Sequence, residues 1–215
     1  MPKADTDACL SIEASELVWN EEGLSEAHGY ILPALVPRLR QAEGRHVLDL
    51  GCGNGALTDA LTREGFEMTG TDSSGTGITI ARRSYPAADF FQSDVDSPLP
   101  DELHGAFDSV IAVEVIEHLL LPRNLFQRAR EALRPGGSFI VTTPYHGYAK
   151  NIALALCNKF DAHWHPLRDH GHVKFFSPAT LSQLFEEQSF TVRAVRRLGR
   201  IPAIAKSMLV EGVLN

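Results

Sequence analysis

Three glycines at alternate positions constrain this chain more than any other feature of its sequence. Residues 47–55 read Val-Leu-Asp-Leu-Gly-Cys-Gly-Asn-Gly, a short apolar run that contains Asp49 and leads into Gly51, Gly53 and Gly55. A buried parallel strand that ends in glycines lets a ligand approach the backbone closely, because a Cβ at those positions would block it. The sequence therefore predicts a nucleotide-type cofactor site at the end of this strand.

The spacing of these glycines differs from that of dinucleotide-binding proteins. Their Gly-x-Gly-x-x-Gly pattern leaves a helix N-terminus free to hold a pyrophosphate, whereas no glycine follows Gly55 here before Gly65. The tighter run, with Asp49 before it, suits a ligand that has an amino-acid end and no phosphate. The spacing thus argues against a dinucleotide-dependent oxidoreductase.

Apolar runs alternate with helical stretches through most of the chain. This alternation with short loops predicts a parallel sheet that is covered by helices on both faces. Strands are expected at 46–50, 68–71, 88–91, 109–113 and 139–143, and helices near 55–64, 76–84 and 122–134. Beyond residue 143 the pattern changes to a helix at 178–188, with Ser177 as its cap, and strands at 190–197 and 207–214.

Four further segments follow the glycine run in a fixed order. The strand 67–72 ends in Asp72, about twenty residues after the glycines, where a carboxylate accepts hydrogen bonds from ribose hydroxyls. The others are Ser93-Asp94-Val95, the strand from Phe107 to Val113, and Leu133-Arg134-Pro135-Gly136-Gly137. Over residues 28–210, the five segments together resemble the motifs of class I S-adenosylmethionine-dependent methyltransferases.

This resemblance implies an α/β fold of three layers, with a Rossmann-like, mostly parallel sheet of seven strands and an antiparallel last strand. It implies S-adenosyl-L-methionine as the cofactor, with Asp72 on the ribose and residues 93–95 at the adenine amino group. A Cβ added at Gly51 is expected to fill the space of the ligand. The implied cofactor-binding residues are Asp49, Gly51, Cys52, Gly53, Asp72, Ser73, Asp94, Val95 and Val113.

Two carboxylates and an imidazole stand close together where the fourth strand ends. Glu114, Glu117 and His118 lie in Glu-Val-Ile-Glu-His-Leu, and in a helical turn the positions i, i+3 and i+4 share one face. Ligands bind at the carboxyl ends of strands in such folds, so half of a metal site is expected here. The remainder is expected from the histidine-rich stretch 163–172, with His172 as the best candidate and His170 able to exchange roles with it.

Glu-x-x-Glu-His with a distant histidine resembles two O-methylating families, the ubiquinone-pathway O-methyltransferases and the small-RNA 2′-O-methyltransferases, in which such residues hold a divalent ion. The resemblance implies that Glu114, Glu117, His118 and His172 bind a metal. Mixed oxygen and nitrogen ligands suit magnesium, manganese, iron or zinc. The alternative is a site without metal, in which His118 is a general base or a packed residue. His118 and His146 are the candidates for taking a proton in catalysis.

The chain length fits one domain with a sizeable core, so residues 1–215 are predicted to form a single methyltransferase domain. Residues 1–40 are expected to form a helical cap over the cofactor, in which Trp19 and Tyr30 are either lids or packing residues. Residues 144–176 form a substrate-side insertion, because long connections in compact domains are often functional. The side chains expected to contact substrate are Tyr145, His146, Tyr148, Trp164 and His170.

Within this insertion, residues 148–160 predict a short apolar helix with Lys150 and Lys159 near its ends. Three interpretations stay open: a helix half buried on its own domain, a lid over an apolar substrate, or an interfacial anchor. The last resembles the insertion at this place in ubiquinone-pathway enzymes, so a peripheral membrane contact is one of the expectations.

Composition narrows the class of partner. The formal net charge of −7 argues against a nucleic-acid surface, because phosphate binding needs clustered cations. The three cysteines are scattered without a Cys-x-x-Cys spacing, which favours reduced thiols in a cytoplasmic protein. No signal-type segment and no run of about eighteen apolar residues is found, so no membrane span is expected. The oligomeric state is left open.

The function favoured by these features is methyl transfer from S-adenosylmethionine to a hydroxyl oxygen of a small, aromatic or polyhydroxylated molecule, assisted by a divalent metal. The alternatives are an RNA 2′-O-methyltransferase, a metal-independent N- or C-methyltransferase that uses His118 as its base, and a cofactor-binding module without activity. The net charge disfavours the first alternative, and the intact Glu114, Glu117 and His118 disfavour the last.

Overall fold

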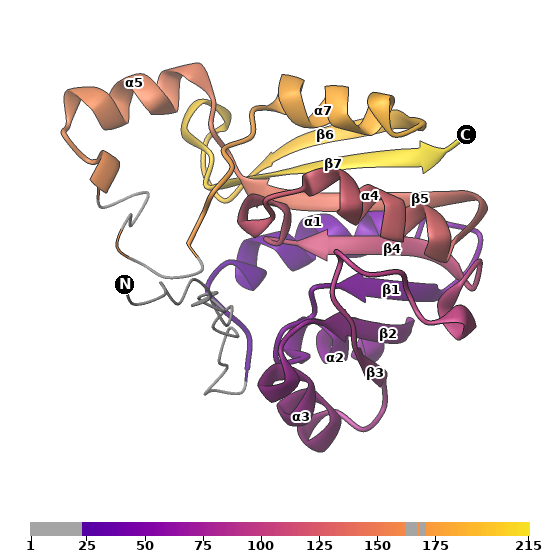
Figure 1. The fold of residues 1–215 in the computed structure, drawn as a ribbon. Helices are drawn as coiled ribbons and strands as arrows, with labels where there is room; N and C mark the ends of the chain where they lie inside the picture. Colours follow the sequence, from indigo (N-terminus) through magenta and orange to yellow (C-terminus); the bar gives the residue numbers. More distant parts are fainter. Residues whose placement is uncertain (1–22, 162–166, 168–170) are drawn as a thin grey trace, which may run out of the picture.

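The computed structural model describes residues 23–161, 167 and 171–215 (Figure 1). Within those residues, seven strands form one sheet in the order β3-β2-β1-β4-β5-β7-β6. The strands are β1 His46–Leu50, β2 Glu67–Asp72, β3 Asp89–Gln92, β4 Phe107–Val113, β5 Leu133–Pro144, β6 Phe190–Leu198 and β7 Ser207–Leu214. The helices are α1 His28–Leu39, α2 Ala56–Arg63, α3 Gly75–Ser84, α4 Pro122–Ala132, α5 Tyr148–Leu156 and α7 Pro178–Glu187, with short 3₁₀ helices η1 Asp101–Leu103, η2 Ile116–His118 and η3 Pro202–Ile204.

The strand directions confirm the predicted fold class. β1 pairs in parallel with β2 and β4, and the parallel arrangement continues to β3 on one side and β5 on the other. The last strand, β7, lies between β5 and β6 and runs antiparallel to both. The chain thus forms a mostly parallel seven-stranded sheet with one antiparallel strand.

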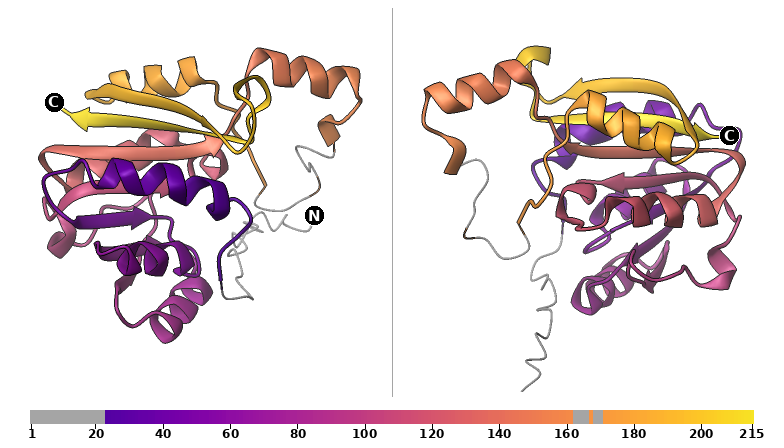
Figure 2. Two further views of the ribbon diagram at one scale, coloured as in Figure 1. Left: turned by 180° about the vertical axis from the view of Figure 1, so that it is seen from behind. Right: turned by 45° about the horizontal axis from the view of Figure 1, so that its top comes forward.

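Helices cover both faces of this sheet (Figures 1 and 2). On one face, α1 buries Ile31, Leu35 and Leu39 against the sheet beside α2. On the other face, α4 and α7 pack around a cluster of aromatic rings from four elements, Phe126, Phe139, Phe185 and Phe190. The hydrophobic core therefore lies in two layers, one on each side of the sheet.

The helix boundaries follow local signals in the sequence. Pro122 begins α4, because its fixed φ suits a first helical turn, and Ser177 caps α7 in a reciprocal capping box with Thr180. The predicted end of α4 is two residues too late. Leu133 already pairs with Phe107 of β4, so the segment Arg134-Pro135-Gly136 lies in β5 and does not terminate a helix.

The expected N-terminal cap is described only from residue 23 onwards, and Trp19 lies outside the described residues. In the described part, α1 packs on a face of the sheet as one of its covering helices. Tyr30 of α1 is partly buried and lies against Ser207 at the start of β7. The N-terminal helix therefore reaches the edge of the sheet at which the parallel strands end.

Candidate functional site

The glycine loop joins β1 to α2 in a backbone conformation that L side chains rarely adopt. Gly51 and Gly55 have φ angles of 85° and 80°, and the amides of Gly51 and Cys52 both donate to the carbonyl oxygen of Thr71, at 2.7 and 2.9 Å. A Cβ on Gly51 would lie 2.5 Å from Cγ2 of Val115. A side chain at position 51 would therefore clash with a neighbouring side chain of the fold, and its effect on a ligand stays a prediction.

Asp72 holds this loop in place from the end of β2. Its Oδ2 accepts a hydrogen bond from the Gly53 amide at 2.8 Å, and its Oδ1 accepts one from the Ser74 amide at 2.8 Å. Both bonds are to backbone amides, so the carboxylate is fixed in orientation beside the glycine loop. Ser73, next to it, is exposed, and its carbonyl accepts from Gln92 of β3.

Asp49 is buried in β1, directly before the loop. Thr58 of α2 donates to its Oδ2 at 2.8 Å, whereas its Oδ1 is buried with no hydrogen-bond partner among the described residues. Burial, with a smaller contribution from the charge of Asp72, raises the pKa of Asp49 to about 7. A buried acceptor left unsatisfied beside a glycine loop fits a ligand that brings a cationic donor, such as an amino-acid ammonium group.

The remaining residues predicted for the cofactor lie along the same edge of the sheet. Cys52 is buried in the loop, and burial raises the pKa of its thiol. Asp94 is exposed after β3, where its Oδ1 accepts from the amide of Asp96, and Val95 beside it is partly buried. Val113 is buried at the end of β4. Since β1 and β4 lie at the point where the strand order reverses, this edge is where ligands bind in open α/β sheets.

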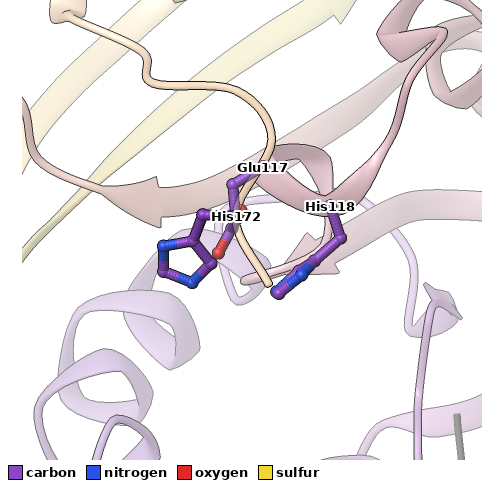
Figure 3. A group of neighbouring side chains, drawn as sticks. All are labelled: Glu117, His118 and His172. Carbon is purple, nitrogen blue, oxygen red and sulfur yellow. The ribbon is translucent and has the colours of Figure 1, made fainter. Parts of the chain in front are cut away.

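Three side chains of types that can bind a metal ion lie close together at the same edge (Figure 3). One ligand atom from each of Glu117, His118 and His172 lies within 4.8 Å of the others. Glu117 and His118 come from η2, and His172 comes from the loop before α7. Backbone hydrogen bonds hold the two segments together, because the amides of Val173 and Lys174 both donate to the carbonyl of Glu117, at 2.8 and 3.0 Å.

Glu117 is the buried member of this group. Thr143 donates to its Oε2 at 2.9 Å, while its Oε1 is buried with no hydrogen-bond partner among the described residues. Burial raises the pKa of Glu117, and the nearby charge of Glu114 raises it further. Because an uncompensated buried carboxylate is costly, this oxygen calls for a cation or a donor.

The rings of His118 and His172 lie edge to face, with centroids 4.9 Å apart and an interplanar angle of 75°. Nδ1 of His118 lies 3.2 Å from the carbonyl oxygen of Gly171. A carbonyl oxygen only accepts, so Nδ1 carries the proton, and the lone pair of the neutral ring is on Nε2. A hydrogen bond of this kind sets the tautomer of a metal-binding histidine.

Glu114 has a different environment from the other three predicted ligands. Its φ is 56°, and the helical turn expected from residue 114 is replaced by a 3₁₀ turn that starts at Ile116. The side chain of Glu114 accepts hydrogen bonds from Thr142 at 3.0 Å and from Ser207 at 3.3 Å. Burial raises the pKa of Glu114 to about 7. The structure therefore places Glu114 beside the group but outside its set of mutually close ligand atoms.

The three described residues among those predicted to contact substrate differ in their exposure. Tyr145 is buried, with the Arg197 guanidinium 5.1 Å from its ring centroid, and His146 is buried with its ring edge-on to Phe175. Tyr148 is 84% exposed on α5. Trp164 and His170 lie outside the described residues, so the possible exchange between His170 and His172 also stays a prediction.

Several residues of this edge carried no signal in the sequence. Thr58 and Thr143 hold the buried carboxylates, and Thr142 and Ser207 hold that of the partly buried Glu114. Each of the four is an ordinary hydroxyl residue within a strand or helix. A groove of about 430 Å³ also lies beside the loop that carries His172, between residues 120–124 and 174–180. It includes the exposed apolar side chains Leu120, Leu121 and Phe175.

α5 projects from the domain (Figure 1) and has no buried residue. Lys150, Asn151 and Leu154 are partly covered, while Ile152 and Leu156 are exposed. The expectation of a helix half buried on its own domain is therefore wrong for most of its length. None of the helices in the described segments is long and apolar enough to cross a membrane.

Comparison with known proteins identifies the family. A family profile described as "Methyltransferase domain" matches residues 25–195. A ubiquinone biosynthesis O-methyltransferase from Azorhizobium caulinodans is 35% identical over 147 residues, which cover 66% of this chain and 57% of that protein. A protein of the same name from Cronobacter sakazakii is 28% identical over 204 residues, covering 91% of this chain and 83% of the relative. The chain thus spans little more than half the length of the first of these relatives.

The fold is shared with solved structures at low sequence identity. The crystal structure of magnesium protoporphyrin IX methyltransferase from Synechocystis, with bound SAH, superimposes with a TM-score of 0.64 at 17% identity, covering 86% of this chain and 82% of the other. This likeness agrees with the strand order and with the glycine loop at the end of β1. The chain therefore belongs to the methyltransferase domain family and has the fold of class I S-adenosylmethionine-dependent methyltransferases.

Proposed function

We propose that this protein transfers a methyl group from S-adenosylmethionine to a hydroxyl oxygen of a small molecule, with the help of a divalent metal ion. The observation that carries the proposal is the buried Oε1 of Glu117, which has no hydrogen-bond partner among the described residues and lies with two histidines at the cofactor edge of the sheet. The names of the ubiquinone biosynthesis relatives support oxygen as the methyl acceptor.

Bound S-adenosylmethionine supplies a methyl group that its sulfonium already activates. The protein's task is then to bind and orient it. The glycine loop and Asp72 would hold the ribose end, with Asp94 and Val95 near the adenine. Asp49, with its unsatisfied Oδ1, would compensate a cationic part of the cofactor from within the sheet.

Glu117, His118 and His172 would hold the metal ion, which lowers the pKa of a bound hydroxyl group and fixes its position. Glu114 is the candidate for a fourth ligand. One carboxylate oxygen and two imidazole nitrogens form a mixed set that suits manganese, iron or zinc as well as magnesium. An acceptor with two vicinal hydroxyl groups could bind the metal ion through both oxygens. This favours a catechol or another polyhydroxylated molecule as the acceptor.

Other residues would accept the proton of the acceptor hydroxyl and contact the rest of the acceptor. With His118 assigned to the metal, we assign the role of proton acceptor to His146, which follows the end of β5 at the same edge of the sheet. The groove lined by Leu120, Leu121 and Phe175 would receive the part of the acceptor that does not react. The in-line alignment of oxygen, methyl carbon and sulfur is largely a matter of positioning, which bound groups supply efficiently.

The test is metal content and methyl transfer in the protein and in Glu117→Gln. We expect the purified protein to bind Mn²⁺ in calorimetric titration, to methylate catechol, and to lose turnover on chelation. Glu117→Gln should lower turnover by at least about 100-fold, more than the loss of an outer-sphere partner causes. Its affinity for S-adenosylmethionine should stay within a few-fold of the parent value.

Glu186→Gln, at an exposed position of α7, is the matched control and should change neither metal binding nor turnover. Turnover that is indifferent to chelators, in a protein without stoichiometric metal, would reject the metal. His118 would then return as the general-base candidate.

We also propose that α5 and η3 make a peripheral contact with a membrane surface that carries negative charge. A pocket of about 350 Å³ between them is lined by four cationic side chains, Lys150, Lys159, Arg200 and Lys206, of which Lys206 is also paired with Glu26. The exposed apolar side chains Ile152, Leu156, Ile201 and Ile204 lie on the same two elements or directly beside them. Apolar side chains flanked by cations suit an anionic lipid interface. We propose that the protein is located in the cytoplasm and makes this membrane contact from there.

A further inference from the structure

Three hydroxyl groups at the ends of β5 and β7 hold the buried Glu117 and the partly buried Glu114 of the candidate metal centre. Thr143 donates to Oε2 of Glu117 at 2.9 Å, and Thr142 donates to Oε1 of Glu114 at 3.0 Å. Ser207 donates to Oε2 of Glu114 at 3.3 Å. Each bond fixes one carboxylate oxygen, so the orientation of both acids is set by residues of the sheet.

Thr142 also fixes the backbone of Glu114. Its Oγ1 accepts from the Glu114 amide at 3.2 Å, and the Thr142 carbonyl accepts from the same amide at 3.1 Å. Glu114 has a φ of 56°, which is strained for a residue with a side chain. The hydroxyl therefore ties the main chain and the carboxylate of this residue to one position on the neighbouring strand.

The hydrogen bonds continue to the N-terminal helix. Tyr30 Oη lies 3.2 Å from Ser207 Oγ. Because the proton of Ser207 is used in its bond to Glu114, Tyr30 is the donor to Ser207. A helix at the start of the chain thus supports a carboxylate at the end of β4 through a serine of the last strand.

We propose that Thr142, Thr143 and Ser207 are positioning residues that orient Glu114 and Glu117 for a divalent ion. The inference rests on the metal assignment above and extends it to residues with no ligand atom in the group. With Oε2 of Glu117 held by Thr143, Oε1 is the oxygen presented to the ion. Outer-sphere partners of this kind keep a ligand in place before the metal arrives, which removes the cost of ordering it.

Thr143→Val tests the Glu117 half of the proposal, since valine keeps the shape of threonine and removes the donor. We expect Mn²⁺ affinity, measured by calorimetry and by the electron paramagnetic resonance signal of unbound Mn²⁺, to fall about 10- to 100-fold. Thr143→Ser, which restores the hydroxyl, should return the affinity to within a few-fold of the parent value. S-adenosylmethionine binding by the same preparation serves as the check on folding.

Ser207→Ala tests the Glu114 half and should also weaken Mn²⁺ binding; it supplies the comparison if valine at position 143 prevents folding. Ser138→Ala is the matched control, because Ser138 lies on β5 and its hydroxyl bonds that of Ser109, at 2.8 Å, and neither glutamate. Parent-like affinity in the folded Thr143→Val and Ser207→Ala proteins would overturn the inference and leave the metal centre standing. A parent protein that binds no Mn²⁺ would instead reject the metal centre itself.

Discussion

Asp49 and Glu117 are buried carboxylates with the same arrangement. In each, a threonine hydroxyl holds Oδ2 or Oε2, and the other oxygen has no partner among the described residues. Burial raises the pKa of both. Since buried polar atoms in folded proteins nearly always have a partner, the two oxygens mark the places where ligands would complete the structure. One lies at the glycine loop and the other among the histidines.

Asp49 should make the ligand-free protein less stable as the pH rises. Burial raises the pKa of Asp49 from 3.8 to about 7. Its contribution to the free energy of unfolding is therefore fully present below about pH 4 and is lost as the pH rises through 7. The difference between the two pKa values corresponds to roughly 4 kcal/mol in the free energy of unfolding. In Asp49→Asn, urea unfolding at several pH values should show a smaller decline in the free energy of unfolding between pH 4 and 8.

Asp101→Asn, at an exposed position of η1, is the control and should show the parent's decline. Equal declines in Asp49→Asn and the parent would mean that Asp49 is not desolvated in solution. Gly51→Val is a poorer test of this loop, because the clash with Val115 and the positive φ would disturb folding together with ligand binding.

At the scale of elements, the ends of the strands and the segments that follow them carry the site. β5 and β7 supply the hydroxyls, η2 supplies Glu117 and His118, and the loop tied to η2 by two backbone bonds supplies His172. α5 is the exception, because it follows β5 at this edge but buries none of its side chains. An exposed apolar helix of this kind usually has a partner outside the domain.

Leu156→Gln tests α5 as a membrane contact. Leu156 is 83% exposed, so the substitution should leave stability within about 0.5 kcal/mol of the parent. Its loss of apolar surface should reduce sedimentation with vesicles that contain anionic phospholipid, and high salt should reduce the binding of the parent.

Leu120→Gln, at a leucine that is 73% exposed in the groove beside the candidate site and not on α5, provides the comparison for sedimentation alone and should sediment like the parent. Parent-like sedimentation of Leu156→Gln would exclude α5 as the contact. A reduction confined to catechol methylation would make α5 a lid over the acceptor.

At the scale of the whole molecule, the aromatic cluster lies in the core, whereas the candidate site lies at an edge of the sheet. Phe126 meets Phe139 and Phe185 at centroid distances of 5.2 and 4.8 Å, and so joins α4, β5 and α7 in the core. The candidate site lies at the carboxyl ends of the strands, where Glu114 follows β4 and Tyr145 follows β5. Stability and binding can therefore be changed separately.

Phe126→Ala should lower the free energy of unfolding by about 3 to 5 kcal/mol, because the ring is fully buried and its removal leaves a cavity. Denaturant unfolding gives this value, and calorimetry on the folded protein should show little change in affinity for S-adenosylmethionine. Tyr148→Ala, at an exposed position, should leave stability unchanged. A large loss of cofactor affinity in folded Phe126→Ala would show that the core and the site are coupled.

The sequence by itself determined the fold and the strand ends at which the candidate site lies. Alternating apolar runs and helical stretches fix a parallel sheet, because each element must bury one face against the next. The glycine run then marks the end of β1, since glycine adopts the φ angles of 85° and 80° at Gly51 and Gly55 without steric strain. The bounds of β7 agree with the prediction residue for residue, because a strand bounded by loops and buried along most of its length leaves a clear pattern.

Tertiary structure alone decided how the site residues are arranged. Sequence spacing put Glu114 on one helical face with Glu117, but the positive φ of Glu114 and its bonds to Thr142 and Ser207 place it outside the group formed by Glu117, His118 and His172. The partners of these acids lie on strands far away in the chain. No local pattern encodes such contacts, because a hydroxyl residue in a strand looks the same whether it faces a carboxylate or a neighbouring backbone.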